Sequence, residues 1–587
     1  MKQIFHGLPA APGIGIGNLF VYRSHRFHME MGVIDYADNA DQEWHQFSAA
    51  KARVDAELVQ LGNAENTLVA EVFTAQRVIL QDQTLLQAVH NAIFTEGQSA
   101  LSATRNVVCD LAELFRNLGD EYFAGRSVDI LDIGQRLLAH MGGPTVGVER
   151  LQAIPAQTIL IASDLIPSEL TQLPLDHVLG IALAESTPTA HSAILARTLG
   201  IPMACTLGDA ILALPSGPAI LDGDTGELLI LPSAGELTKY QATQQQQVAK
   251  RASALAHAQE AAETTDGHLI TILANVNSPE EITQVLTTGA AGVGLLRTEY
   301  LFQDRLAPPT FAEQYETYLA LAKQLNGHQL TVRALDAGGD KPMKYLHHPL
   351  EANPFLGLRG IRLLLDQPEL LRTQFRALYH VALSTQGTVE IRFMLPLISA
   401  VDEMRAARRL LQAVIEEEVE RNHGPQRNTK TDTASASLHV AQTIKIGAMI
   451  EIPSAALIAP RLAKYVDFFS IGTNDLAQYV LATDRTNASV AALADPMHPS
   501  VIQLIKLTCD AGLAAAIPVS ICGEMSGDPL AVPLLLGLGL TELSAPLPAV
   551  PLVKEAVRNC TLAAARVMAM QSLHCADAQD VRALLTG

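Results

Sequence analysis

The sequence predicts a multidomain α/β protein, with a (β/α)8 barrel as its C-terminal domain and a smaller α/β domain that contains an inserted all-α helical domain. Two observations predict this fold class. After Gly267, eight short runs of β-forming residues alternate with segments of helical periodicity, the order typical of a (β/α)8 barrel. Before Gly267, β-like runs flank a long stretch of helical periodicity on both sides. A chain of 587 residues is long enough for about three or four such domains.

The first two predicted domains are interleaved in the sequence. Residues 1–23 are apolar, are punctuated by Gly and Pro and end in the β-like run NLFVY, whereas residues 24–145 place apolar residues at helical spacing. Residues 146–232 return to short β-like runs separated by turn signals. We therefore expect residues 1–23 and 146–232 to form one discontinuous α/β domain, with the helical domain of residues 24–145 inserted into it.

The remaining sequence predicts a connecting helix and the barrel. Residues 233–262 are rich in Ala and Gln, lack Pro within their helical stretch and are polar on nearly all sides, which favours a solvated linker helix. Residues 263–587 are expected to form the barrel, with its strands in the runs HLITILANV, AGVGLLR, LTVRALD, TVEIRFMLPLI, KIGAMIE, DFFSIG, PVSICGE and TELSAP. The polar segment Asn422–Gln442 cannot bury a core and predicts a surface loop.

Charge and composition exclude several classes of protein. With 41 Lys and Arg residues against 61 Asp and Glu residues, the net charge is −20, which disfavours nucleic acid as a partner but allows local cationic sites for small anions. No run approaches the roughly 18 apolar residues of a membrane helix. The opening residues lack a secretory apolar region, and the six cysteines show no CxxC pairing, so we expect a cytoplasmic protein with reduced thiols and no membrane insertion.

Candidate functional residues follow several predicted barrel strands. Catalytic residues of such barrels lie at the carboxyl ends of the strands, and here those ends, with two connecting segments, carry Arg297, Arg333, Arg359, Glu451, Asn474, Asp475, Arg485 and Cys522. Any one of them alone is more often a solvated rim residue. Together, arginine forks suit carboxylate and phosphate groups, and Glu451 with Asp475 supplies the one or two carboxylates that Mg²⁺ takes from protein. The set predicts a small phosphorylated and carboxylated ligand held with a divalent metal.

Two residues are candidates for covalent chemistry. Cys522 is either an ordinary buried small residue or a proton donor or acceptor for a carbanion or enolate. His191, in STPTAHSAILARTLGIP, lies at the expected start of a helix that ends at Gly200. A helix N-terminus favours an anion, and a neutral imidazole there is a competent nucleophile, although a histidine at a helix start is more often a cap or a surface residue.

At these residues the chain resembles enzyme I of the bacterial phosphoenolpyruvate:sugar phosphotransferase system. The most specific stretch is DFFSIGTNDLAQYVLATDR (467–485), and GVGLLRTEYLF, ALDAGGDKP, NPFLGLRGIR, GAMIEIPSA and SICGEMSGDP match the family in the same order. LPAAPGIGIGNLFVY and DILDIGQRLL match its N-terminal part, so the resemblance runs nearly from end to end.

The resemblance implies a phosphoenolpyruvate-protein phosphotransferase that phosphorylates its own His191, passes the phosphoryl group to a histidine of an HPr-type carrier and releases pyruvate, as the first step of sugar uptake. It implies that phosphoenolpyruvate is bound by Arg297, Arg333, Arg359, Asn474 and Arg485. It assigns Mg²⁺ to Glu451 and Asp475, and enolate protonation to Cys522. It also implies a cytoplasmic homodimer formed through the barrels, with residues 24–145 docking the carrier and residues 1–23 and 146–232 as the phosphohistidine domain.

The chain departs from the family pattern at three places. Ser186 and Thr187 stand where Gly-Gly is common before the active histidine, Leu358 stands in place of Trp, and the segment 422–442 resembles an insertion. Thr189 and the residues from His191 to Arg197 fit the pattern. These departures leave open a paralogue that serves a dedicated sugar or regulatory carrier.

Two other functions are open. A phosphoenolpyruvate synthase or pyruvate phosphate dikinase would share the barrel and the swinging histidine, but it needs an ATP-binding domain, and the sequence has no GxxxxGK[ST] loop. A non-catalytic scaffold that senses phosphoenolpyruvate or HPr would be expected to have lost residues such as Arg297 or Cys522, which this chain keeps.

Overall fold

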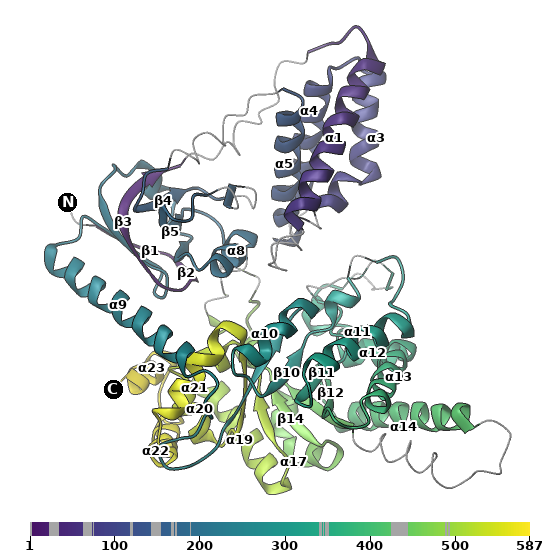
Figure 1. Ribbon diagram of the computed structural model, residues 1–587, viewed down its shortest axis with the longest axis vertical. Helices are drawn as coiled ribbons and strands as arrows, with labels where there is room; N and C mark the ends of the chain where they lie inside the picture. The colour runs from purple at the N-terminus through teal and green to yellow at the C-terminus, as the bar shows by residue number, and fades with distance from the viewer. Residues whose placement is uncertain are drawn as a thin grey trace. The chain divides into compact units, whose positions relative to one another are not determined.

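The computed structural model divides the chain into two compact units, Met1–Ala249 and Lys250–Gly587, which are described separately (Figure 1). It describes residues 3–22, 35–62, 73, 76–117, 121–142, 154–165, 169–170, 173–187, 190–303, 305–339, 343, 345–346, 351–423, 444–485, 487, 490 and 493–586. Pro188, Thr189 and most of the predicted loop 422–442 lie outside these residues.

The first unit contains an eight-stranded sheet to which both ends of its sequence contribute. The strands occur in the spatial order β1-β8-β7-β3-β4-β5-β6-β2. Strands β3 and β4 pair in parallel, for example Phe20 with Leu160, although residues 22–157 lie between them in the sequence. The strands span Gln3–His6 (β1), Leu8–Ala11 (β2), Ile14–Val21 (β3), Thr158–Ala162 (β4), Val178–Leu183 (β5), Met203–Cys205 (β6), Pro218–Asp222 (β7) and Glu227–Ile230 (β8).

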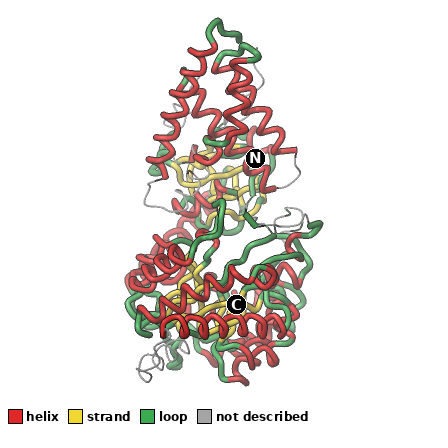
Figure 2. Tube along the Cα trace, turned by 90° about the vertical axis from the view of Figure 1, so that its right-hand side faces the viewer, coloured by secondary structure: helices red, strands yellow, loops and turns green. Residues whose placement is uncertain are grey.

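The described part of the segment between β3 and β4 is helical, and its buried side chains belong to a core cluster that also includes residues of the sheet. Its described helices are α1 (Ala40–Gly62), α3 (Gln83–Phe94), α4 (Ala100–Asn117) and α5 (Glu121–His140), and Figure 2 shows them as long red tubes. Asp82 caps α3 by accepting a hydrogen bond from the backbone of Thr84. Gly134 lets α5 approach α4, since a Cβ at this position would lie 2.4 Å from Val108 Cγ1. The predicted class, an α/β domain with an inserted all-α part, is confirmed.

A single polar helix, α9 (Ala234–Ala256), follows the sheet, and the boundary between the two units falls within it. Ser233 and Glu236 begin the helix as a capping box, because the Glu236 carboxylate accepts from the Ser233 backbone while Ser233 Oγ accepts from the Glu236 backbone. Ala254 is its one fully buried residue, and Leu237 and Tyr240 pack, partly buried, against an apolar cluster of the sheet, so propensity and capping support a helix that buries little surface.

The second unit is a closed barrel of eight parallel strands, which confirms the predicted (β/α)8 barrel. The order β10-β11-β12-β13-β14-β15-β16-β9 closes through the pairing of β16 with β9. The strands are buried on both faces, which explains why each reads as a nearly continuous apolar run. They span Thr271–Val276 (β9), Gly292–Leu296 (β10), Gln329–Arg333 (β11), Ile391–Leu395 (β12), Lys445–Ile450 (β13), Phe468–Ile471 (β14), Val519–Ile521 (β15) and Glu542–Pro546 (β16).

Helices surround the barrel in Figure 1. They are α10 (Ile282–Thr287), α11 (Phe311–Gln324), α12 (Ile361–Asp366), α13 (Pro368–Ser384), α14 (Val401–His423), α16 (Pro453–Leu457), α17 (Ala459–Leu462), α18 (Thr473–Val480), α19 (Pro499–Ala515), α20 (Val532–Leu538), α21 (Val550–Arg558), α22 (Leu562–Ser572) and α23 (Ala578–Thr586). In the first unit, α8 (His191–Leu199) follows β5. Asn422 and His423, which were expected in a surface loop, are the last residues of α14.

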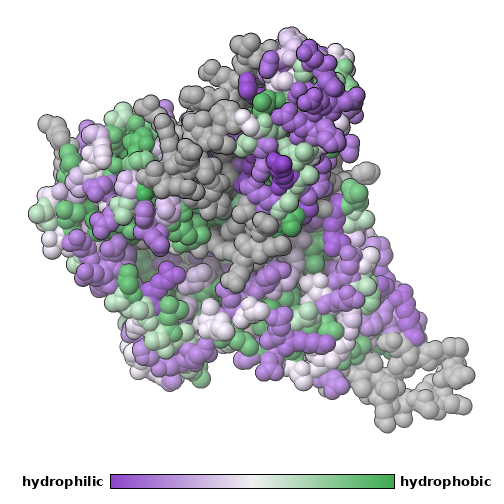
Figure 3. All heavy atoms as spheres, turned by 45° about the horizontal axis from the view of Figure 1, so that its top comes forward, coloured by the Kyte–Doolittle hydropathy of each residue, from purple (hydrophilic) through white to green (hydrophobic). Residues whose placement is uncertain are grey.

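Several large apolar side chains are exposed at the surface. Leu306, Leu513, Tyr36 and Leu269 are each at least 70% exposed. Figure 3 shows apolar residues interspersed with hydrophilic ones on the visible face. Among the helices that the structure describes, none has both the length and the apolar character needed to cross a membrane.

An ion pair closes the amino-terminal end of the barrel. Arg392 on β12 and Glu542 on β16 lie on opposite strands, and the guanidinium binds the carboxylate through two hydrogen bonds of 2.8 and 3.3 Å. The Arg392 side chain is 9% exposed and lies 5.3 Å from the centre of the Phe468 ring. Removing one partner of such a pair leaves the other charge buried without compensation.

We expect Arg392→Met to lower the free energy of unfolding of the barrel by about 3–5 kcal/mol. The double variant Arg392→Met with Glu542→Leu recovers most of this loss, because the one partner then left, Glu390 at 2.8 Å from Arg392 Nε, is 46% exposed and stays solvated. Urea denaturation followed by circular dichroism measures both values. A loss below about 1 kcal/mol in the single variant, as for an exposed pair, would contradict this account.

Candidate functional site

The carboxyl ends of the barrel strands meet at one rim, which we call the barrel mouth. Strand pairing aligns Ile450 with Ile471 and Ile471 with Ile521. Glu451, which follows β13, and Cys522, which follows β15, therefore lie at the same level of the mouth on either side of the end of β14. Arg333 ends β11, and Arg297 follows β10 at the same rim.

Arg333 is a buried cation held by two carboxylates. It is 5% exposed, its Nη2 donates to Glu299 Oε1 at 2.6 Å, and its Nη1 lies 3.4 Å from Asp336 Oδ2. Burial lowers the pKa of Arg333, but Glu299 and Asp336 raise it more, so the guanidinium stays charged. Its Nε has no hydrogen-bond partner among the described residues. A buried donor of this kind can be satisfied by a ligand oxygen.

Arg359 links Asp336 to Asp475 and is entirely buried. Its Nε and Nη2 donate to the Asp336 carboxylate at 3.1 and 3.0 Å, and its Nη1 and Nη2 donate to the Asp475 carboxylate at 3.2 and 3.1 Å. Tyr479 accepts a further bond from Nη1 at 3.2 Å, and the Phe355 ring lies beside the guanidinium. Arg359 is therefore fixed in place by three side chains and a ring.

Glu451 and Asp475 are buried carboxylates with opposite protonation behaviour. Burial, with the nearby charges of Asp475 and Asp336, raises the pKa of Glu451 to about 8. Burial also acts to raise the pKa of Asp475, but Arg359 and Arg485 outweigh it and hold that pKa below its usual value. One carboxylate of the pair is thus firmly ionised while the other gains a proton near neutral pH.

The other predicted binding residues lie nearer the solvent. Arg485 is 29% exposed and its Nη1 lies 3.7 Å from Asp475 Oδ1. Asn474, in the first turn of α18, accepts a hydrogen bond from the backbone of Glu524 at 3.0 Å. Burial raises the pKa of both Glu281 and Cys522, and the charge of the exposed Arg297 partly opposes this rise. These groups are more exposed than the buried Arg333 and Arg359.

Cys522 lies just inside the mouth as a neutral thiol. It is 4% exposed, and burial raises its pKa to about 11. Its Sγ accepts a hydrogen bond from Ser470 Oγ at 3.4 Å and donates one to the Ile471 carbonyl at 3.6 Å. A protonated thiol at this position has the form that a general acid requires.

His191 is the first residue of α8, as the sequence predicted, and α8 ends before Gly200, which has a left-handed φ of 70°. Ala190 is the N-cap residue of α8, and its side chain makes no capping hydrogen bond to the first N–H groups of the helix. Ser186 has a φ of 74°, a conformation that glycine adopts more easily. Ser186 thus adopts a glycine-type turn, and its carbonyl accepts a hydrogen bond from Thr206.

Sequence reasoning missed the carboxylates that neutralise the buried arginines. Glu299 and Asp336 occur within the motifs GVGLLRTEYLF and ALDAGGDKP, but nothing in their spacing indicated partners 34 and 23 residues away. We expected four arginines to face two carboxylates, whereas the mouth holds four carboxylates: Glu299, Asp336, Glu451 and Asp475. The four carboxylates balance the four arginines only when Glu451 is ionised, and one positive charge remains when it is protonated.

The mouth offers the donors that Mg²⁺ prefers. Among the described residues, no group of three His, Cys, Asp or Glu side chains forms a ready-made metal site. Glu451 and Asp475 nevertheless supply two hard oxygen ligands, and a divalent cation between them would offset the burial and the carboxylate repulsion that together raise the pKa of Glu451. The donor set fits a metal that takes its remaining ligands from substrate and water.

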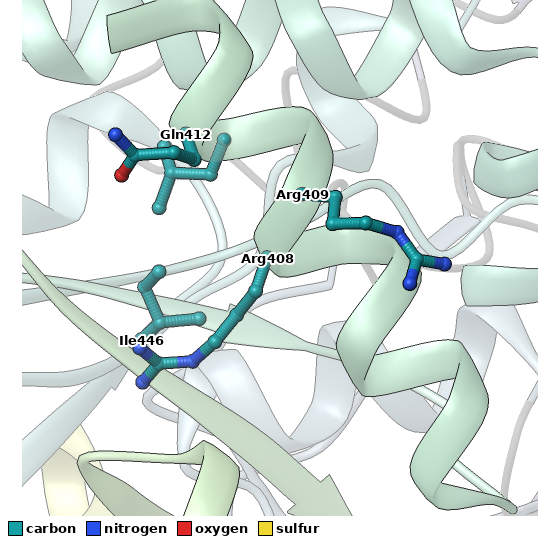
Figure 4. A pocket seen from close by; sticks show the side chains of 5 residues that line it. Arg408, Arg409, Gln412 and Ile446 are labelled. Carbon is teal, nitrogen blue, oxygen red and sulfur yellow. The ribbon is translucent and has the colours of Figure 1, made fainter.

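The cavity in Figure 4 lies away from this site. It has a volume of about 280 Å³ and is lined by Arg408, Arg409, Leu411, Gln412 and Ile446. Ile446 lies near the start of β13, whereas Glu451 follows its end. Arg408, whose side chain extends toward Ile446 in Figure 4, is already paired with Asp467 at 3.0 Å.

Three family models of PEP-utilising enzymes match the chain. The N-terminal model matches residues 6–126, the mobile-domain model matches residues 154–226, and the PEP-binding-domain model matches residues 251–562. The last of these alone covers more than half of the chain.

Similar proteins include members of two curated groups. A multiphosphoryl transfer protein of Xanthomonas campestris pv. campestris is 40% identical, over 98% of this chain and 66% of its own length. The phosphoenolpyruvate-protein phosphotransferase of Staphylococcus carnosus is 35% identical, over 99% of this chain and 98% of its own. That of Bacillus subtilis is 36% identical, over 92% of each chain. The chain thus spans about two thirds of the first relative and nearly all of the other two.

Proposed function

The chain belongs to the PEP-utilising enzyme family as a phosphoenolpyruvate-protein phosphotransferase, and from this premise we propose that it transfers the phosphoryl group of phosphoenolpyruvate to its own His191. The phosphoryl group then passes to a histidine of an HPr-type carrier, and pyruvate is released. The family resemblance read from the sequence is confirmed by these relatives. The residue roles, the metal and the partners below are our proposals.

The observation that carries the proposed binding site is the buried chain Arg333–Asp336–Arg359–Asp475 at the barrel mouth. Phosphoenolpyruvate is a small anion with a phosphate and a carboxylate, and planar guanidinium groups bind both kinds of group bidentately. Arg333 and Arg359 are positioned in advance by carboxylates, so binding orders few side chains. Arg297, Asn474 and Arg485 complete the site from the rim.

Glu451 and Asp475 would hold Mg²⁺, which when bound supplies charge stabilisation to the transferring phosphoryl group. Arg359 already occupies both oxygens of Asp475. A phosphate that accepts hydrogen bonds from Arg359 would loosen this pair and release Asp475 as a ligand. We therefore expect phosphoenolpyruvate and Mg²⁺ to strengthen each other's binding.

His191 would attack the phosphorus while the arginines bind the phosphoryl oxygens, and the enolate left behind would take a proton from Cys522. The position of His191 at a helix N-terminus favours the anionic phosphohistidine. The helical domain of residues 24–145 would dock the carrier, and the polar helix α9 would connect the two units. We also propose a homodimer formed through the barrels.

Labelled phosphoenolpyruvate tests this function directly. The full chain with Mg²⁺ should acquire acid-labile label and release pyruvate in equal amounts, and added HPr-type carriers should remove the label. A parallel reaction contains ATP and pyruvate instead. ATP-dependent formation of phosphoenolpyruvate would favour a synthase or dikinase, and binding without turnover would favour a sensor.

The affinity for Mg²⁺ should depend on pH in a defined direction. Mg²⁺ needs an ionised carboxylate, and the pKa of Glu451 is raised to about 8, so affinity should rise as pH increases toward 8 and level off above it. Because the folded pKa is raised, the metal-free fold should lose stability over the same rise in pH. Calorimetric titration with Mg²⁺ measures the affinity. Glu451→Gln should weaken binding and flatten its pH dependence, and a pH-independent affinity in the unsubstituted protein would exclude Glu451 as a ligand.

A further inference from the structure

A buried hydrogen bond just below the barrel mouth has no role in the phosphoryl transfer described above. Ser470 lies on β14 and Cys522 directly follows β15, the neighbouring strand. Ser470 Oγ donates to Cys522 Sγ at 3.4 Å, and the thiol donates to the Ile471 carbonyl at 3.6 Å. Ser470 is fully buried and Cys522 is 4% exposed. The orientation of the thiol is thus set by one donor and one acceptor.

The surroundings make this donor important whenever the sulfur is charged. Cys522 packs in an apolar cluster with Leu295, Met394, Met449 and Phe468, which cannot solvate a thiolate. The charged groups that act on it are Glu451, which raises its pKa, and Arg333 and Arg297, which lower it. Burial is the largest effect on the pKa of Cys522, and the hydrogen bond from Ser470 is the largest one that opposes it.

We propose that Ser470 is a positioning residue for proton transfer by Cys522, an inference that rests on the proposed function. The Ser470 hydroxyl holds the sulfur while the thiol hydrogen turns from the Ile471 carbonyl toward C3 of the enolate. The S–H bond breaks and a C3–H bond forms with the electron pair of the enolate. The former S–H pair stays on sulfur as a thiolate, which the Ser470 O–H stabilises, and a proton from solvent later restores the thiol.

Two separate measurements test this role in the full chain with Mg²⁺. Single-turnover labelling with phosphoenolpyruvate reports phosphoryl transfer, and NMR in D₂O reports the incorporation of deuterium into the methyl group of pyruvate. The second reaction needs the Cys522 thiolate as its base. Ser470→Ala should slow it about ten- to hundredfold, as expected for loss of one hydrogen bond to a charged group, and should change labelling by less than about twofold.

The pH profile distinguishes positioning from general damage. Without its donor the thiolate is less stable, so the exchange rate of Ser470→Ala should rise at a higher pH than in the unsubstituted protein, by about one pH unit for a tenfold effect. Ser470→Thr keeps a hydroxyl and should restore much of the rate. Ser520→Ala is the matched control, because Ser520 lies beside Ser470 in the strand register, is also buried and donates to the Phe469 carbonyl instead.

The outcomes separate this inference from the function on which it rests. Failure of the unsubstituted protein to acquire label overturns the proposed function. Normal labelling together with unchanged exchange and an unchanged pH profile in Ser470→Ala overturns the role of Ser470 alone. Equal losses in Ser470→Ala and Ser520→Ala would also overturn it, because they would indicate only a disturbed barrel interior.

Discussion

Replacing His191 with alanine should abolish the labelling of the chain by phosphoenolpyruvate. The methyl group of alanine cannot attack phosphorus, whereas the helix α8 that begins at residue 191 should persist because alanine is the best helix former. Acid-labile label should therefore fall to background, and pyruvate release in the presence of a carrier should stop with it. Separation of labelled protein from free substrate measures the first effect, and a coupled pyruvate assay measures the second.

The control variant is His6→Ala, which removes an exposed histidine of the same unit whose ring lies 3.3 Å from Glu227. It should label normally. Calorimetry should show that His191→Ala still binds phosphoenolpyruvate with Mg²⁺ with less than about a twofold change in affinity, because the proposed binding residues all come from the barrel. Label that survives in His191→Ala would reject this histidine as the acceptor.

The fold class could be predicted from the sequence because the relevant signals are local. Each barrel strand is a short apolar run, as in AGVGLLR or KIGAMIE, since strands covered by helices outside and side chains inside face no water. The alternation of such runs with helical periodicity then leaves a parallel barrel as the natural arrangement. The start of α8 and its end before Gly200 are local in the same sense.

The partners of the site residues are not local, and the sequence did not indicate them. Arg359 joins Asp336 and Asp475, which lie 23 and 116 residues away, and this depends on the direction in which each side chain leaves its loop. The contact of Ser470 with Cys522 depends on the register of β14 and β15, which no pattern in one strand contains. The sequence could therefore assign these residues to the barrel mouth, but it could not predict which of them form ion pairs.

This difference changes how the charge of the mouth is understood. Because the chain has a net charge of −20, the four arginines were predicted to form an isolated cationic site. The buried arginines are instead paired with carboxylates, so a ligand does not enter an uncompensated positive field. It must compete for guanidinium groups that already have partners. The affinity of the barrel mouth for its ligands then depends on two exchanges. Arg359 must exchange Asp475 for the phosphate, and Asp475 must exchange Arg359 for the metal.

Arg359→Met should therefore produce the largest combined loss of stability and binding among the mouth residues. It leaves Asp336 and Asp475 buried without their shared cation, which should lower the free energy of unfolding of the barrel by about 3–5 kcal/mol. It also removes a bidentate donor, so phosphoenolpyruvate should bind about 10- to 100-fold more weakly. Urea denaturation and calorimetry measure the two effects.

A second variant separates the two losses. Arg485→Ala removes a 29% exposed arginine whose nearest contact with Asp475 is 3.7 Å, so it should weaken ligand binding while changing the free energy of unfolding by less than about 1 kcal/mol. Arg359→Lys should keep the charge but lose the planar fork, and should recover stability better than binding. If Arg359→Met proved as stable as the unsubstituted protein, the two aspartates would not depend on Arg359 for compensation. The competition between Arg359 and the metal for Asp475 would then have to be abandoned.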